Sequence, residues 1–170
     1  EEKTNVMRIL EQKGIPFTPH TYPHEEGVAV DGVSVARSLG QDPECVFKTL
    51  VARGASKGIY VFEVPVAESL DLKKAARAVG EKSIELLHVA EINAVTGYIR
   101  GGCSPLGMKK RLRTVLDSSA RAQAAIVVSA GKIGYQVELS PQDLAGLAEA
   151  DFSSPELWRI YSALRRRADE

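Results

Sequence analysis

Lys48 is the residue whose surroundings most suggest chemistry. It lies in an apolar, β-forming run, residues 46–51, and on a strand it would share one face with Val46 and Leu50. A half-buried ammonium on that face needs an anionic partner, and a phosphate or a developing oxyanion would serve. The alternative is a lysine whose ammonium extends into solvent from an edge strand. The residues alone leave both interpretations open.

A glycine-rich segment, residues 97–107, is the second candidate for chemistry. It has four glycines in eleven positions around a Ser-Pro turn. Glycine lets a backbone approach a ligand closely, so the N–H groups of such a segment can line an oxyanion or phosphate nest. Ser129 begins another corner of small residues, at the end of an apolar run. Both corners are therefore candidate ligand-binding segments.

Cysteine and histidine chemistry receives little support from the sequence. A cysteine nucleophile needs a base or a positive neighbour, and no Cys/His/Asp signature surrounds Cys45 or Cys103. Cys103 stays a candidate because it lies inside the glycine-rich segment. His20 and His24 have the spacing of metal ligands on a helix, but flanking prolines favour an extended strand that would hold them about 13 Å apart. We therefore expect no metal site and no cofactor, and GxSxG, HExxH and P-loop motifs are absent from the sequence.

The rest of the chain predicts the elements that would position these groups. Helical spacing of apolar residues, with capping residues at the ends, predicts helices at residues 4–14, 33–39, 72–79, 90–95 and 141–147. Extended apolar runs predict strands at 17–23, 46–53, 58–66, 114–116, 125–129 and 135–139, with a short apolar run at 84–87. The second and third of these strands flank a glycine-containing turn, which favours a hairpin. The predicted fold class is therefore α/β, of the α+β-like kind, around one mixed or largely antiparallel sheet.

Length and charge limit the class of protein further. The chain has 170 residues, 44% hydrophobic and 26% charged, so it is predicted to fold as a single domain. Its 22 basic and 22 acidic side chains cancel, whereas a general nucleic-acid coat protein is basic. The densest basic run, residues 109–113, is either a phosphate-contacting patch or a solvated turn. Membrane-span and signal-region patterns are absent, so we expect a cytoplasmic protein with no membrane and no DNA partner.

Seven short motifs follow one another along the chain. They are VFKTL (46–50), LDLKK (70–74), TGY (96–98), GGCSPLG (101–107), KKRL (109–112), VSAGK (128–132) and ELSPQDL (138–144). In this order they resemble the YbaK-type Cys-tRNA(Pro) deacylases, which are similar to the editing insertion of bacterial prolyl-tRNA synthetases. The resemblance covers roughly residues 4–149.

The resemblance implies a fold as well as an activity. The fold is a single domain with a mixed, β-barrel-like sheet and surrounding helices, and the activity is hydrolysis of mischarged cysteinyl-tRNA. Residues 1–150 would form this editing domain. Residues 151–170 lie outside it, and apolar residues on one face of residues 154–167 predict an appended C-terminal helix.

The resemblance also implies roles for single residues. Lys48 matches the essential lysine of the family, and Thr49 follows it in the same way. We expect Lys48 to hold the terminal phosphate or the ribose end of the tRNA. Gly101 and Gly102 match the backbone of the substrate loop, and their N–H groups are expected to stabilise the developing oxyanion.

Two further matches and two departures concern the substrate pocket. Tyr22 and Ser129 match the tyrosine and the serine of the family's pocket and are expected to orient the substrate. Cys103 stands where relatives commonly have an aliphatic residue. Ile133 stands where many have an arginine, which removes one phosphate contact. Substrate preference is therefore less fixed by the resemblance than the fold is.

Together these observations predict a trans-editing hydrolase or lyase that deacylates Cys-tRNA(Pro). The resemblance implies a mechanism in which the substrate's own thiol attacks its carbonyl. The expected partner is the acceptor end of aminoacyl-tRNA, and prolyl-tRNA synthetase, bound in trans, is a second candidate partner. Two alternatives stay open. One is a tRNA-end binding module or synthetase accessory without chemistry, and the other is a deacylase selective for Ala-tRNA(Pro).

Overall fold

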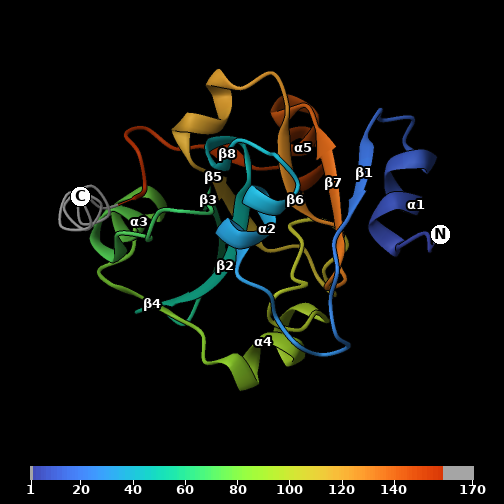
Figure 1. Ribbon diagram of the computed structural model, residues 1–170. Coiled ribbons are helices and arrows are strands. Elements are labelled where there is room, and N and C mark those ends of the chain that lie inside the picture. The colour runs from blue at the N-terminus through green and yellow to red at the C-terminus, as the bar shows by residue number, and fades with distance from the viewer. Residues whose placement is uncertain (1, 159–170) are drawn as a thin grey trace, which may run out of the picture.

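The structure, a computed structural model, describes residues 2–158 and consists of helices packed around two β-sheets (Figure 1). The helices are α1 (Asn5–Gln12), α2 (Gly32–Ser38), α3 (Leu72–Val79), α4 (Val89–Thr96) and α5 (Pro141–Ala148), with 3₁₀ turns at Pro43–Cys45 and Ser118–Ala122. The strands are β1 (Thr18–Thr21), β2 (Phe47–Gly54), β3 (Ile59–Pro65), β4 (Ile84–Leu86), β5 (Arg113–Leu116), β6 (Ile126–Ser129), β7 (Tyr135–Leu139) and β8 (Asp151–Phe152). The prediction of a mixed α/β fold is therefore confirmed.

The strands form two sheets instead of the one that the sequence predicts. β1, β7 and β6 form an antiparallel sheet, and the second sheet has the order β4-β2-β3-β5-β8. In the second sheet β2 pairs antiparallel with β3 and β4, whereas β5 pairs in parallel with β3 and β8. An isolated parallel bridge between Val46 and Val127 joins the two sheets. No closed barrel is found among the described strands, so the barrel-like part of the prediction stays unconfirmed.

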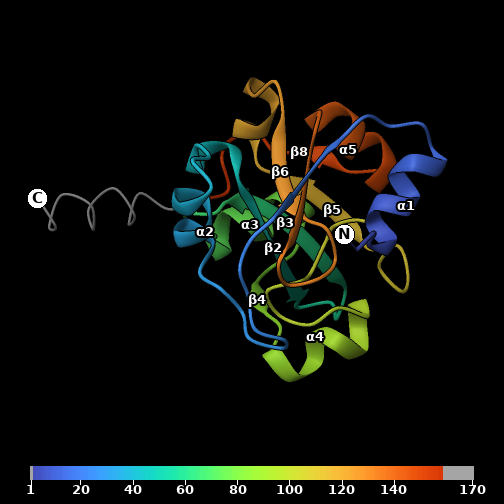
Figure 2. The ribbon, with the colours of Figure 1, turned by 45° about the vertical axis from the view of Figure 1, so that its right-hand side comes forward.

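Two large groups of buried apolar side chains hold the layers together. The first joins α1 and α5 to the sheets and includes Leu10, Val137 and Leu144. The second lies between α3 and the five-stranded sheet and includes Phe62 and Leu157. Full burial of such a side chain contributes about 1.5–3 kcal/mol to folding. In Figure 2, α1 and α2 lie on opposite sides of the sheets, and no described helix is long and apolar enough to cross a membrane.

Capping residues set the helix ends where the sequence predicts them. The Thr4 side chain accepts a hydrogen bond from the Met7 N–H at the start of α1. The Asp71 carboxylate accepts the N–H groups of the next turn at 3.0 Å and begins α3, which ends at Gly80 with a φ of 74°. These short-range interactions explain why the predicted range 72–79 coincides with α3.

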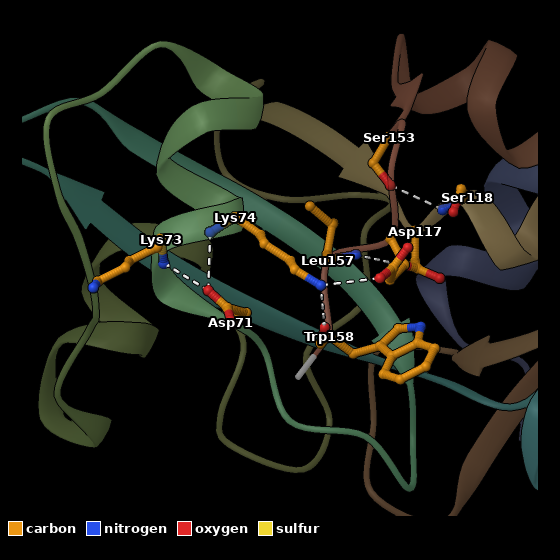
Figure 3. A network of polar contacts seen from close by, with 9 residues as sticks. Asp71, Lys73, Lys74, Asp117, Ser118, Ser153, Leu157 and Trp158 are labelled. Atoms are coloured by element: carbon orange, nitrogen blue, oxygen red, sulfur yellow. Dashed lines mark hydrogen bonds and ion pairs between the residues drawn. The ribbon is translucent and has the colours of Figure 1, made fainter. Parts of the chain in front are cut away.

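The chain after α5 returns to the five-stranded sheet. β8 pairs with β5, and Leu157 is only 1% exposed. The buried Asp117 carboxylate accepts the Leu157 N–H at 2.7 Å, and Lys74 Nζ donates to the Trp158 carbonyl at 3.2 Å (Figure 3). Residues 153–158 are not helical, so the helix predicted from Ser154 does not begin there. The rest of that predicted helix lies outside the described residues.

Candidate active site

A cavity of about 340 Å³ opens beside the bridge that joins the two sheets. β4 pairs only with residues 52–54 of β2, so the earlier part of β2 forms one wall of the cavity. The other walls come from the segment before α2, the glycine-rich segment, β6 and the start of β7. Five of the six predicted site residues line it, namely Tyr22, Lys48, Thr49, Gly101 and Ser129. Its volume lies in the range of small-ligand sites.

Lys48 is half-buried in this wall. No hydrogen bond or ion pair joins its ammonium to another residue of the part that the structure describes. Burial lowers the pKa of Lys48, and the carboxylates of Glu68 and Asp31 oppose that shift. Since Lys48 lines the cavity, the interpretation as a lysine reaching into open solvent is not supported. Its position suits an anion that a ligand brings.

Thr49 and Glu63 carry buried polar atoms at the same wall. Thr49 Oγ1 and both carboxyl oxygens of Glu63 lack a hydrogen-bond partner among residues 2–158. The two residues stand opposite each other on β2 and β3, and Glu63 is 0% exposed. Burial raises the pKa of Glu63 well above its ordinary value, and the nearby Thr49 hydroxyl opposes that shift. Burial therefore favours the neutral form of this carboxyl, which lies directly behind a residue that lines the cavity.

The glycine-rich segment presents one of its two predicted glycines to the cavity. Gly101 has a φ of 88°, and a Cβ on it would lie 2.8 Å from the Cβ of Ala29, so only glycine fits without strain. The Gly102 N–H donates to the Ile99 carbonyl at 3.0 Å, and a Cβ there would lie 3.1 Å from the backbone nitrogen of Ile133. The Gly102 N–H therefore takes part in the turn of this structure, and its contact with an oxyanion stays a prediction.

Tyr22 and Ser129 approach the cavity from the three-stranded sheet. Tyr22 follows β1, and its ring packs edge-on against His24 with the ring centroids 6.3 Å apart. Ser129 ends β6, and its Oγ accepts a hydrogen bond from the Gly131 N–H at 3.1 Å. The Ser129 hydroxyl proton remains available to donate to a ligand.

Neither cysteine has the surroundings of a nucleophile. Cys103 lines the cavity but is 7% exposed, and burial raises its pKa to about 12. Cys45 donates through Sγ to Gln123 Oε1 at 3.2 Å, and burial raises its pKa as well. Thiolates are scarce at such sites near neutral pH.

His20 and His24, the two histidines with metal-ligand spacing, make separate contacts. His20 Nε2 lies 2.7 Å from Glu138 Oε1, while His24 packs on an aromatic ring. Within residues 2–158, no three metal-ligating side chains of the His, Cys, Asp and Glu types gather in one place.

Three polar residues of the cavity were missed by the sequence analysis. Asp31 is the N-cap of α2, and its carboxylate accepts the Ser34 N–H at 3.0 Å. Arg100 is exposed and brings a second cation to the cavity. Gln136 is 7% exposed on β7. In the alternating pattern of β7 it shares a face with Glu138 and not with the core residues Val137 and Leu139, so the sequence does not signal its burial.

The two departures from the family pattern meet at the glycine-rich segment. Cys103 packs with Val51 and Leu87. Ile133 is 3% exposed, and a Cβ on Gly101 would lie 3.5 Å from its Cγ1. Both side chains therefore fill apolar space beside the cavity.

Comparison with known proteins places the chain in a family. The model of the aminoacyl-tRNA editing domain matches residues 27–147. A protein of Enterococcus faecalis, provisionally named Cys-tRNA(Pro)/Cys-tRNA(Cys) deacylase EbsC, is 44% identical over 153 residues, which are 90% of this chain and 93% of that relative.

Solved structures share the fold. The crystal structure of a candidate trans-editing enzyme for prolyl-tRNA synthetase has a TM-score of 0.76 at 24% identity, covering 94% of this chain and 99% of that chain. The hypothetical protein APE2540 has a TM-score of 0.75 at 20% identity, covering 86% and 95%. The family model matches residues 27–147 and the relative aligns with 90% of this chain, so the chain belongs to the aminoacyl-tRNA editing domain family, in its YbaK type.

Proposed function

We propose that this protein is a trans-editing enzyme that deacylates mischarged Cys-tRNA(Pro). The observation that carries the proposal is the cavity lined by Lys48, Thr49, Tyr22, Ser129 and Gly101. Membership of the editing family and the 44% identity with a relative named for this activity support it. The reaction cleaves the ester between cysteine and the 3′-terminal ribose of the tRNA. Its proposed place is the cytoplasm, where tRNA is charged.

Lys48 binds the anionic end of the tRNA in this proposal. Its ammonium is half-buried and has no close partner within the described chain, so the terminal phosphate or the ribose oxygens supply the missing interaction. Arg100, exposed beside Gly101, adds positive charge to the same cavity. Both cations favour an RNA end over a neutral ligand.

The reacting group is the thiol of the substrate itself. Its thiolate sulfur attacks the ester carbonyl carbon, and the carbonyl electron pair moves onto oxygen. The tetrahedral intermediate then expels the ribose oxygen, which takes a proton. The products are uncharged tRNA and a cyclic thiolactone of cysteine, which water opens to free cysteine. A thiol with a pKa of about 8.5 is partly ionised near pH 7, so correct positioning supplies much of the acceleration.

The cavity walls position the ester for this attack. The Gly101 N–H is the proposed donor to the developing oxyanion, in place of the pair of donors expected from the sequence. Tyr22 and Ser129 orient the aminoacyl group through their hydroxyls. Thr49 Oγ1, which lacks a partner in the described protein, gains a hydrogen bond when substrate is bound.

A deacylation assay tests the proposal. Purified protein is mixed with Cys-tRNA(Pro), Ala-tRNA(Pro) and Pro-tRNA(Pro) in parallel, without synthetase, with Lys48→Ala as the control. We expect rapid loss of cysteine, slower loss of alanine and intact Pro-tRNA(Pro). Faster release of alanine would assign the protein to the alanine-selective alternative. Binding of tRNA with no release above the Lys48→Ala rate would identify a binding module. Repeating the assay with prolyl-tRNA synthetase present tests that second proposed partner.

A further inference from the structure

A second cavity, also of about 340 Å³, has a lining in which every charged side chain is basic. It lies between the end of α1, residues 105–112 and the end of α5. Its cations are Lys13, Lys109, Lys110 and Arg111, and we call this cavity the basic cleft. Because the 22 basic and 22 acidic residues of the chain balance, the basic cleft is a local excess of positive charge.

Most of this charge is not neutralised by the protein. Lys13 and Lys110 form no ion pair with any residue in the range 2–158. Lys109 Nζ contacts only a backbone carbonyl, at 3.3 Å. Arg111 pairs with Glu149 at 3.0 Å, but both side chains are more than half exposed, and such pairs contribute little. An anionic ligand would therefore meet at least three available cations.

A second surface cleft with several lysines also has an acidic residue in its lining, unlike the basic cleft. The cleft beside α3 is lined by Lys73, Arg77 and Lys82, but Glu81 lies among them. It provides a matched control, since it has exposed lysines without the continuous basic lining.

The basic cleft and the active-site cavity share the glycine-rich segment. Gly101 and Cys103 line the active site, and Pro105 and Gly107 line the basic cleft. Six residues span at most about 20 Å, so the two cavities lie within that distance along the segment. In Figure 2 the yellow segment that leads from α4 to β5 passes below α1. A separation of this size corresponds to roughly six steps of a stacked nucleotide strand.

We propose that the basic cleft binds backbone phosphates of the tRNA acceptor stem while the aminoacyl end occupies the active site. The inference rests on the proposed function. Three of the four cations are lysines, which contact phosphates as point charges and lack the bidentate geometry that selects one small anion. Lys109, Lys110 and Arg111 follow one another along the chain, and Lys13 lines the same cleft from the end of α1. Such a series of cations suits a row of phosphates. Apolar residues of the lining, Ile9 among them, offer a surface for the sugars.

The test compares two substrates that share the reacting ester. One is Cys-tRNA(Pro), and the other is the cysteinyl ester of a CA dinucleotide, whose single internucleotide phosphate belongs at Lys48 and which offers no further phosphate to the basic cleft. Lys13→Glu/Lys110→Glu is the test variant, and Lys73→Glu/Lys82→Glu is the control with the same change of charge. We expect the ratio of kcat/KM for full-length over short substrate to fall at least tenfold in the test variant and less than twofold in the control.

Binding of uncharged tRNA gives a second readout that does not depend on catalysis. The slope of log affinity against log salt concentration should become less steep by about 2 in the test variant. Each phosphate contact contributes roughly 0.7–0.9 to that slope. An unchanged ratio, an equal loss on both substrates, or an equal effect of the control variant would overturn the proposal. If wild-type protein cleaves neither ester, the proposed function fails. The salt dependence of tRNA binding then still shows whether the basic cleft contacts phosphates.

Discussion

Glu63 stands directly opposite Thr49 on the paired strands β2 and β3, and it is fully buried while Thr49 lines the cavity. Burial disfavours the charged form of a carboxyl in this position and raises the pKa of Glu63. Lys48 is a charged side chain of the same part of β2, and it lines the cavity beside Thr49.

The Glu63→Gln variant should lack the decrease in the free energy of unfolding that the wild type shows as the pH rises. The folded pKa is raised above the ordinary 4.5, so the folded state retains a proton that the unfolded state releases as pH rises. The free energy of unfolding of the wild type should therefore fall above pH 4.5, by up to about 1.4 kcal/mol per pH unit, until the folded pKa is passed. Urea unfolding from pH 5 to 8 measures this slope. The exposed Glu85→Gln serves as the control, and parallel curves for wild type and Glu63→Gln would contradict the assignment.

Lys48→Ala should abolish turnover and leave the fold intact. Since the ammonium has no close partner in the described protein, its removal deprives the substrate of an anion-binding group without breaking an internal ion pair. Lys48→Arg should also be poor, because a planar guanidinium does not replace a compact ammonium in a small cavity. Circular dichroism checks folding, and Lys82→Ala is an exposed control. A folded Lys48→Ala variant with wild-type rates would refute the role.

Binding of the tRNA end should weaken as the pH rises, and the decline should begin below pH 10.5, the ordinary pKa of lysine. Burial lowers the pKa of Lys48, and the charged form that binds the anion is lost as pH rises through that pKa. Uncharged CCA-ended oligonucleotide avoids spontaneous ester hydrolysis and allows affinity to be measured from pH 7 to 10.5. Lys48→Ala should bind weakly with no such decline. A flat wild-type profile over this range would show that Lys48 is not the titrating group.

Replacing both cysteines with alanine should lower the rate less than tenfold, about 1.4 kcal/mol of barrier. The thiols of Cys45 and Cys103 are held protonated by burial. Single-turnover deacylation of Cys-tRNA by the double variant measures the effect, with circular dichroism to check the fold. Complete loss of a folded variant's activity, with an acyl-thioester trapped on the wild type, would make Cys103 a nucleophile.

Cys-tRNA should be deacylated at least about a hundredfold faster than Ser-tRNA on the same tRNA, roughly 2.7 kcal/mol in the barrier. The two side chains are nearly isosteric, but only the thiol is partly ionised and strongly nucleophilic near pH 7. Single-turnover rates for both esters, and for Cys-tRNA alkylated at sulfur, provide the comparison. Equal rates for the two esters, or an undiminished rate after alkylation, would leave water activation near Lys48 as the better mechanism.

Elements set by neighbouring residues could be predicted from the sequence. α3 has its start at Asp71 and its end at Gly80 encoded within one short segment, and the β2–β3 hairpin follows from two β-forming runs and a turn. The division into two sheets and the docking of residues 151–158 depend on partners far along the chain. β8 pairs with β5, and Leu157 binds Asp117, and no local pattern encodes such pairings.

The site shows the same limit. The apolar run around Lys48 singles out this lysine, and the corner of small residues marks the segment that begins at Ser129. Tyr22 could be placed only through resemblance to a family. Arg100 and Asp31 join the cavity because tertiary packing brings their loops together. For Gly102, the glycine-rich composition of its segment suggests an N–H group open to a ligand. In the structure that N–H donates to the Ile99 carbonyl within a turn.

The docking of Leu157 also bears on how the chain folds during synthesis. The ribosome synthesises strands β2 and β3 and helix α3 well before Leu157, yet Leu157 packs into the apolar cluster at the face that these elements share. A nascent chain that has emerged only as far as residue 150 exposes that face on the ribosome. Such a surface is prone to aggregation until Leu157 packs against it.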